Sequence, residues 1–101
     1  MAIKTHYDPV TRVRTITIEK DFTFLILSQF QAAFRSGQPD DKFVIDFTQS
    51  SFIDSSGLGM LLMHREFAGG TDADITLAHP NEEILRVLRI ANFDQLFNIV
   101  P

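Results

Sequence analysis

Alternation of polar and β-branched residues marks the beginning of the chain. Residues 11–18 alternate around Ile16 and Ile18, and although the period of two is imperfect, the composition predicts a strand. Residues 2–6 are expected to form a short edge strand before it. Pro9 fixes its own backbone and restricts the preceding residue, which favours a turn between the two strands. The pattern therefore predicts an N-terminal hairpin.

A helical period follows the hairpin. Apolar residues recur three and four positions apart up to about residue 35, at Leu27, Phe30, Ala33 and Phe34. Asp21 and Thr23 are the two candidate N-caps, and Gly37 is expected to end the helix. The apolar residues at 22–24 are ambiguous, because a short run of this kind can also extend a strand.

The remainder of the chain alternates strand patterns with helix patterns. Residues 42–47 form a compact run of strand formers, typical of a buried parallel strand, and a helix is expected from 54 to about 67. Residues 73–78 alternate again and predict another strand. The segment 81–90 begins with an Asn cap and two Glu residues, which suit the start of a helix. Residues 92–95 resemble a second cap, which predicts a further C-terminal helix.

The order of these elements is β-β-α-β-α-β-α-α. Strands separated by helices are expected to be parallel, and the opening hairpin makes the sheet mixed. The pattern therefore predicts an α/β fold with a mixed sheet of four to five strands, packed by about four helices. A length of 101 residues fits one domain spanning residues 1–101, and 45% hydrophobic with 22% charged residues is a globular composition.

Composition excludes several kinds of chemistry. The chain has no Cys, so disulfides, thiol chemistry and Cys-based zinc sites are excluded. A net charge of -4 with scattered basic residues disfavours nucleic acid. No apolar stretch approaches the roughly 20 residues that span a bilayer, and the N-terminus lacks a signal pattern, so a cytoplasmic location without membrane insertion is expected. Neither a metal nor a cofactor is expected, because three residues lack metal-ligand spacing: His6, His64 and His79.

The segment Asp54-Ser55-Ser56-Gly57-Leu58-Gly59 carries the clearest functional signal. It follows the carboxyl end of a predicted strand and leads into a helix, and sites in open α/β sheets form at this edge. The unpaired N–H groups and the dipole of a helix N-terminus favour an anion. A hydroxyl at this position is therefore well placed to carry a phosphate, although a plain N-cap role for Asp54 or Ser55 is the alternative.

Glycine and methionine residues around this turn suggest a contact surface. Gly57 and Gly59 cost roughly 1 kcal/mol each in helix propensity relative to Ala, and they are interpreted as clearing the first turn for a partner. Met60 and Met63 either add an adaptable apolar contact or fill the core. The residues expected to bind a partner are Asp54, Ser55, Ser56, Gly57, Leu58, Gly59, Met60 and Met63.

The run Phe-Ile-Asp-Ser-Ser-Gly-Leu-Gly-Met-Leu-Leu at residues 52–62 resembles the signature of STAS-domain anti-sigma factor antagonists. Residues 43–47, 84–88 and 93–97 resemble the flanking parts of that family. Residues 19–24 depart from its commonest pattern, which has a glycine in this loop, and this leaves the partner's identity open.

The resemblance implies a regulatory function. It implies that Ser55 is phosphorylated by an anti-sigma factor that is also a serine kinase, with Ser56 as the rival acceptor. It also implies partner switching: the unphosphorylated form binds the anti-sigma factor, phosphorylation releases it, and a PP2C-type phosphatase reverses the modification. The alternative is a non-switching STAS module, such as a subunit of a lipid-transport ATPase.

Enzymatic functions are not supported by the motifs. Asp54, Ser55 and His64 have the residue types of a hydrolase triad, but the pattern Gly-x-Ser-x-Gly is absent. Weak nucleotide binding stays open, although no phosphate-gripping lysine follows the glycines. The chain is therefore expected to be a binding protein and not an enzyme.

Overall fold

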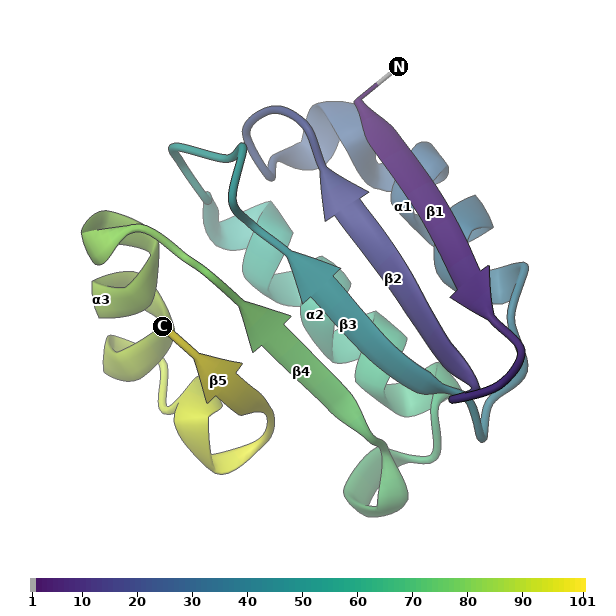
Figure 1. Ribbon diagram of the computed structural model, residues 1–101. Coiled ribbons are helices and arrows are strands. Elements are labelled where there is room, and N and C mark those ends of the chain that lie inside the picture. The colour runs from purple at the N-terminus through teal and green to yellow at the C-terminus, as the bar shows by residue number, and fades with distance from the viewer. Residues whose placement is uncertain (1) are drawn as a thin grey trace.

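The computed structural model describes residues 2–101 and contains one five-stranded sheet in the order β1-β2-β3-β4-β5 (Figure 1). β1 and β2 pair antiparallel, with Ile3 opposite Ile18, and every later strand adds in parallel. The strands are β1 Ile3–Asp8, β2 Val13–Ile18, β3 Lys42–Asp46, β4 Ile75–Ala78 and β5 Asn98–Val100.

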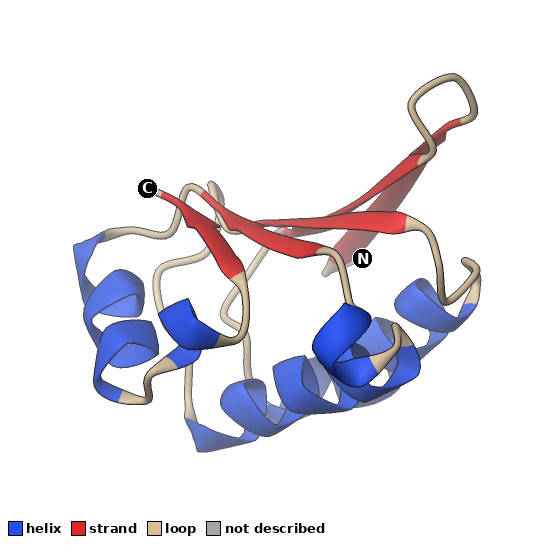
Figure 2. Ribbon diagram, turned by 90° about the horizontal axis from the view of Figure 1, so that it is seen from below, coloured by secondary structure: helices blue, strands red, loops and turns tan. Residues whose placement is uncertain are grey.

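All three α-helices lie on one side of this sheet (Figure 2). β2, β3 and β4 are each followed by a loop that leads into helical structure, so these three loops gather at the carboxyl edge of the sheet (Figure 1). The helices are α1 Leu27–Arg35, α2 Ser55–Phe67 and α3 Glu82–Ile90, and the 3-10 turns are η1 Phe24–Ile26, η2 Gly70–Asp72 and η3 Phe93–Gln95.

The predicted α/β class and mixed sheet with an opening hairpin are confirmed. The predicted C-terminal helix is wrong: residues 92–95 hold only the 3-10 turn η3, because Asn92 adopts a left-handed φ of 60° and makes no side-chain cap. The chain then turns back as β5, whose carbonyl at Val100 accepts from the N–H of His79 at 2.7 Å. Pairing the open edge of β4 satisfies backbone groups that a further helix would leave unpaired.

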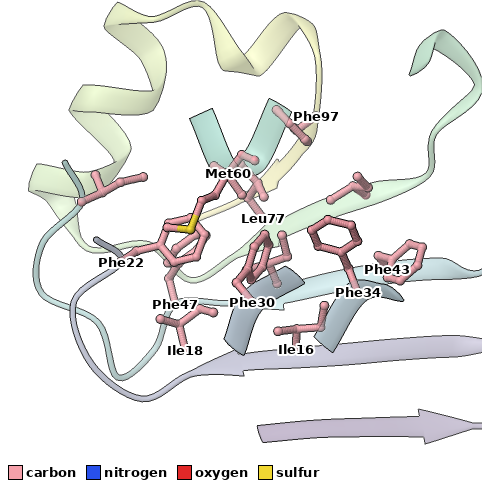
Figure 3. Packing of buried hydrophobic residues seen from close by; sticks show 14 of the residues in the cluster. Ile16, Ile18, Phe22, Phe30, Phe34, Phe43, Phe47, Met60, Leu77 and Phe97 are labelled. Carbon is pink, nitrogen blue, oxygen red and sulfur yellow. The ribbon is translucent and has the colours of Figure 1, made fainter. Parts of the chain in front are cut away.

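Phenylalanine fills the layer between sheet and helices (Figure 3). Phe22 is fully buried and meets Phe30 at 4.9 Å and Phe47 at 5.5 Å between ring centroids, both edge to face. Such pairs contribute about 0.5–1.5 kcal/mol each beyond the burial of their area. Phe22 belongs to the loop after β2, so the core itself anchors that loop at the carboxyl edge.

One titratable side chain lies within this aromatic layer. His64 of α2 is fully buried, stacks on Phe34 at 4.7 Å and meets the edge of Phe43 at 4.4 Å. Neither ring nitrogen has a hydrogen-bond partner among residues 2–101. Burial away from water disfavours the charged ring and lowers the pKa of His64 to about 3. The imidazole is therefore a neutral component of the core at physiological pH.

Candidate functional site

The loop before α1 is bonded to the segment that leads into α2. The N–H of Phe22 donates to the carbonyl oxygen of Phe52 at 2.9 Å, and Phe22 forms a parallel bridge with Ile53. The carbonyl oxygen of Phe22 accepts from the N–H of Asp54 at 3.4 Å. These contacts hold two loops, some thirty residues apart in sequence, side by side at the carboxyl edge of the sheet.

Two serine side chains fasten the same loops. The hydroxyl of buried Ser50 donates to the carbonyl oxygen of Lys20 at 2.7 Å. The hydroxyl of Ser51 donates to Oδ1 of Asp21 at 2.9 Å, and its carbonyl oxygen accepts from Nδ2 of Asn81 at 3.1 Å. Both hydroxyls are thus engaged in holding the loops together.

Asp54 supplies the N-cap of α2. Its backbone is extended, and its Oδ1 accepts from the N–H of Gly57 at 2.8 Å. Ser55 is the first helical residue and is exposed, and its hydroxyl makes no hydrogen bond to any other described residue. Ser56 follows and is half-buried. Asp54 is therefore the residue that caps α2, and the hydroxyl of Ser55 is not needed for capping.

The first turn of α2 contains no acidic residue. The carboxylate of Asp54 at the N-cap occupies one N–H group of this turn, and no further acid follows it. The remaining N–H groups keep part of the positive end of the helix dipole, which favours an anion by about 0.3–1 kcal/mol at an exposed position. An anionic group on Ser55 would lie in this first turn. The local field therefore suits a modified Ser55 within the free protein.

The two glycines of this turn have different reasons to be glycine. Gly57 is buried, and a Cβ there would press on the carbonyl oxygen of Phe22 and lie 2.7 Å from Cγ1 of Ile53. The interpretation that Gly57 clears space for a partner is therefore wrong, because the space is taken by the protein's own loop. Gly59 is exposed, and a Cβ there would have nothing within 4 Å. Only Gly59 can serve an approaching molecule.

The predicted methionine surface also divides in two. Met60 is 2% exposed and lies among the core residues, so it fills the core and offers no contact surface (Figure 3). Met63 is 39% exposed, and its sulfur lies 4.0 Å from Nε2 of Gln31 on α1. Leu58 is half-buried against the core. The outward positions of the predicted set are thus Ser55, Gly59 and Met63, with Asp54, Ser56 and Leu58 partly accessible.

Sequence reasoning missed an apolar cluster beside this turn. Phe24 and Leu25 of η1 and Phe52 of the loop after β3 are exposed, by 64%, 88% and 44% respectively. A hollow of about 330 Å³ lies between the two loops and is lined by Lys20, Asp21, Thr23, Leu25, Ile26 and Phe52. The sequence signal was the candidate cap at Thr23: its side chain accepts from the N–H of Leu25, which makes these residues a tight turn. The consecutive apolar residues that follow cannot all point inward.

Other candidate chemistry is not assembled at this edge. His64 lies in the aromatic core and not beside Ser55 in a catalytic arrangement. Within residues 2–101, no three His, Asp or Glu side chains are grouped so that they could hold a metal ion. Within the same residues, no helix has the length and apolar character needed to cross a bilayer.

Fold and site together define a small α/β domain with a capped serine turn at the carboxyl edge of its sheet. The family model described as "Mlab, STAS domain" matches residues 6–101, so the chain belongs to the STAS-domain family. A STAS-domain containing protein of Pseudomonas aeruginosa is 41% identical over 86 residues, which cover 84% of this chain and 85% of the relative.

Solved structures share the fold at low sequence identity. A Thermotoga maritima protein superposes with a TM-score of 0.84 at 19% identity, covering 98% of this chain and 86% of its own. The anti-sigma factor antagonist SpoIIAA in its unphosphorylated form gives 0.73 at 16% identity, covering 99% and 88%. The phosphorylated form of Bacillus SpoIIAA gives 0.66 at 15% identity, covering 99% and 92%.

Proposed function

We propose that this protein is a phosphorylation-controlled anti-sigma factor antagonist and that Ser55 is its phosphorylated residue. The unphosphorylated form binds an anti-sigma factor that is also a serine kinase, and phosphorylation releases it. A PP2C-type phosphatase then restores the binding form. The observation that carries the proposal is the division of labour between Asp54, which caps α2, and Ser55, whose exposed hydroxyl is free.

The electrostatics of the turn support a switch. A phosphate adds roughly −1.5 to −2 charges and three acceptor oxygens. In the free domain, Ser55 is exposed to water and no acid follows Asp54 in the first turn of α2, so solvent and the helix dipole offset this charge. In a complex, the same charge would be buried next to the carboxylate of Asp54, where repulsion and desolvation both oppose binding. Phosphorylation of Ser55 can therefore be compatible with the folded domain and still prevent binding of the partner.

Relatives of known role support the same proposal. SpoIIAA is described as an anti-sigma factor antagonist, and it has been solved in unphosphorylated and phosphorylated forms. Both forms share the fold of this chain. A protein of this fold is thus able to exist in two phosphorylation states, which is what the proposed switch requires.

Ser55 is favoured over Ser56 by accessibility. A kinase must bring the hydroxyl into its own active site, and Ser55 is exposed while Ser56 is half-buried one position further into the helix. Both are close to the helix N-terminus, so the field does not separate them. Access of the kinase is therefore the discriminating property.

Intact-mass measurement tests the proposal. The purified protein is incubated with ATP and each histidine-kinase-like ATPase encoded near its gene. We expect one added phosphoryl group on the wild type and on Ser56→Ala, and none on Ser55→Ala. Addition to Ser55→Ala but not to Ser56→Ala would assign the site to Ser56. No addition with any of these kinases would instead support the non-switching STAS module.

A further inference from the structure

The backbone of β1 is unpaired along one side. β2 pairs with one side of this strand, and no strand within residues 2–101 pairs with the other, which we call the outer edge of β1 (Figure 1). The strand is six residues long, contains no proline and pairs with β2 without a bulge, whereas β5 at the other end of the sheet has three residues. The outer edge of β1 is therefore the longer of the two free edges, and such edges readily accept another strand.

Hydrogen bonding to β2 shows which residues of β1 face the outer edge. The N–H of Glu19 donates to the carbonyl oxygen of Ala2 at 2.8 Å. Successive residues of an antiparallel strand bond alternately to its two sides, so every second residue after Ala2 bonds to β2. The residues between them direct their N–H and C=O groups outward: Ile3, Thr5 and Tyr7. An added strand would hydrogen-bond to this group.

The charges on β1 are complementary to those of a second copy of the same strand. Lys4 and Asp8 lie on the sheet face away from the helices, because alternation directs them opposite to buried Ile3. The side chain of Lys4 is 73% exposed, although its Nζ lies 3.3 Å from Oε2 of Glu19, and Asp8 forms no ion pair among residues 2–101. When two copies pair antiparallel about His6, Lys4 of each copy lies opposite Asp8 of the other. Opposite charges at such positions favour pairing, whereas like charges oppose it.

α1 leaves room beneath the outer edge. A groove of about 310 Å³ lies between β1 and α1, and α1 contributes small side chains to it, among them Ala32, Ala33 and Ser36. The twofold axis of an antiparallel strand pair is perpendicular to the sheet, so both copies would place their helices on the same side (Figure 2). The inward side chains of an added strand, and the α1 that comes with it, would therefore meet mainly small residues.

We propose that the outer edge of β1 is a homodimer interface, in which two copies pair antiparallel with His6 of each copy at the twofold axis. Thr5 of each copy exchanges two hydrogen bonds with Tyr7 of the other, and the charges at the two ends of the strand are matched. The two sheets then continue as one. The Ser55 turn lies at the carboxyl edge of the sheet, which this pairing leaves uncovered, so the dimer presents two such turns.

Sedimentation of the full-length protein over a range of concentrations tests the interface. We expect a reversible dimer for the wild type, and about tenfold weaker dimerisation for Lys4→Glu and for Asp8→Lys, because each replaces two attractions by two repulsions. Mixing these two variants should restore dimerisation, since the new glutamate then lies opposite the new lysine. Lys20→Glu is the matched control: it makes the same change of charge at an exposed position outside β1 and should dimerise as the wild type does.

Cysteine crosslinking tests the register, because the chain has no cysteine of its own. The two copies of His6 would form a non-hydrogen-bonded pair with Cα atoms about 4.5 Å apart, within the range of a disulfide. His6→Cys should therefore oxidise to a covalent dimer, seen by intact mass without reductant. Lys4→Cys is the control, because its two copies would lie roughly 14 Å apart and should not crosslink.

Four results would overturn the proposal. A wild type that is monomeric at every concentration would leave the outer edge to a strand of another protein. Dimerisation of Lys4→Glu with wild-type affinity would show that the charges of β1 do not meet in the dimer. Failure of the mixed variants to associate would contradict the antiparallel match of charges. Crosslinking of Thr5→Cys in preference to His6→Cys would contradict the register about His6.

Discussion

The first turns of α2 and α3 have the same kind of cap hydrogen bond but differ in charge. Oδ1 of Asp54 accepts from the N–H of Gly57 at 2.8 Å, and Oδ1 of Asn81 accepts from the N–H of Ile84 at 2.8 Å. Both helices follow parallel strands, so both begin at the carboxyl edge of the sheet. α3 then places two acids in its first turn, while α2 places none there.

This difference indicates what makes a helix start available for modification. In α3, Glu82 and Glu83 already occupy the favourable field of the dipole. In α2, the carboxylate of Asp54 is the only acid at the helix start, and the two residues after it are serines, of which Ser55 is exposed. The cap alone identifies a helix start, whereas the absence of acids behind it identifies a place for an added anion.

The largest expected effect in this comparison is the response of the protein's stability to acid through the buried histidine of α2. α2 buries His64 with its pKa lowered to about 3, so the folded state resists a proton that the unfolded chain accepts near pH 6.5. The neutral ring's contribution to the free energy of unfolding is therefore fully present above about pH 6.5 and is lost as the pH falls toward 3. We expect the free energy of unfolding to fall by about 2 kcal/mol between pH 7 and pH 5 from this group.

Urea unfolding at several pH values measures this loss. His64→Leu should remove that part of the pH dependence, while His6→Gln, a change at an exposed histidine on β1, should retain it. Equal pH slopes for wild type and His64→Leu would contradict the neutral buried ring.

The next largest expected effect concerns the third residue of each helix. α3 has Ile84 there, whereas in α2 a side chain on Gly57 would meet the carbonyl oxygen of Phe22. Gly57→Ala should lower the free energy of unfolding by about 1–3 kcal/mol, as overpacking does. Gly59→Ala, which has open space, should raise it by up to about 1 kcal/mol. Chemical denaturation of both variants measures the contrast, and a similar shift for the two would contradict it.

Removing the caps should have similar effects on both helices. Asp54→Ala and Asn81→Ala should each cost about 1 kcal/mol, because each leaves one N–H of the first turn unpaired. Asn81→Ala should cost slightly more, since the Asn81 side chain also donates to the carbonyl oxygen of Ser51. Thermal unfolding measures the pair. A neutral Asp54→Ala would show that Asp54 is not the cap and would return that role to Ser55.

The smallest expected effect comes from exchanging charge between the two first turns. Ser55→Asp gives α2 an acid and should stabilise the free protein by about 0.3–1 kcal/mol at low salt. Glu82→Gln removes one acid from α3 and should destabilise it by a similar amount. Both shifts should shrink as salt is added. Destabilisation by Ser55→Asp at low salt would mean that the turn does not accept negative charge.

Local sequence patterns correctly predicted those helices and strands that are determined by residues close to one another in the sequence. The strand at Lys42–Asp46 and the helix at Ser55–Phe67 were predicted from runs and periods within their own segments. The candidate cap at Asp54 was predicted in the same way. β5 was not, because Asn98–Val100 is too short for a pattern and forms only by pairing with β4.

The site's finer features depend on contacts between distant segments. The reason for glycine at position 57 is the backbone of Phe22, thirty-five residues away, which no local pattern contains. Met60 faces the core because of how α2 packs against the sheet, and its residue type is equally common on a contact surface. The exposure of Phe24 and Leu25 was not predicted, because large apolar residues are usually expected to be buried.

The affinity of the partner kinase for this protein before and after phosphorylation tests the central claim most directly. Binding is measured by calorimetry with the unmodified protein, with the protein phosphorylated on Ser55, and with Ser55→Ala. The account predicts tight binding of the first and third, and at least about a hundredfold weaker binding of the second, which corresponds to about 3 kcal/mol. Equal affinity for the unmodified and phosphorylated forms would contradict it.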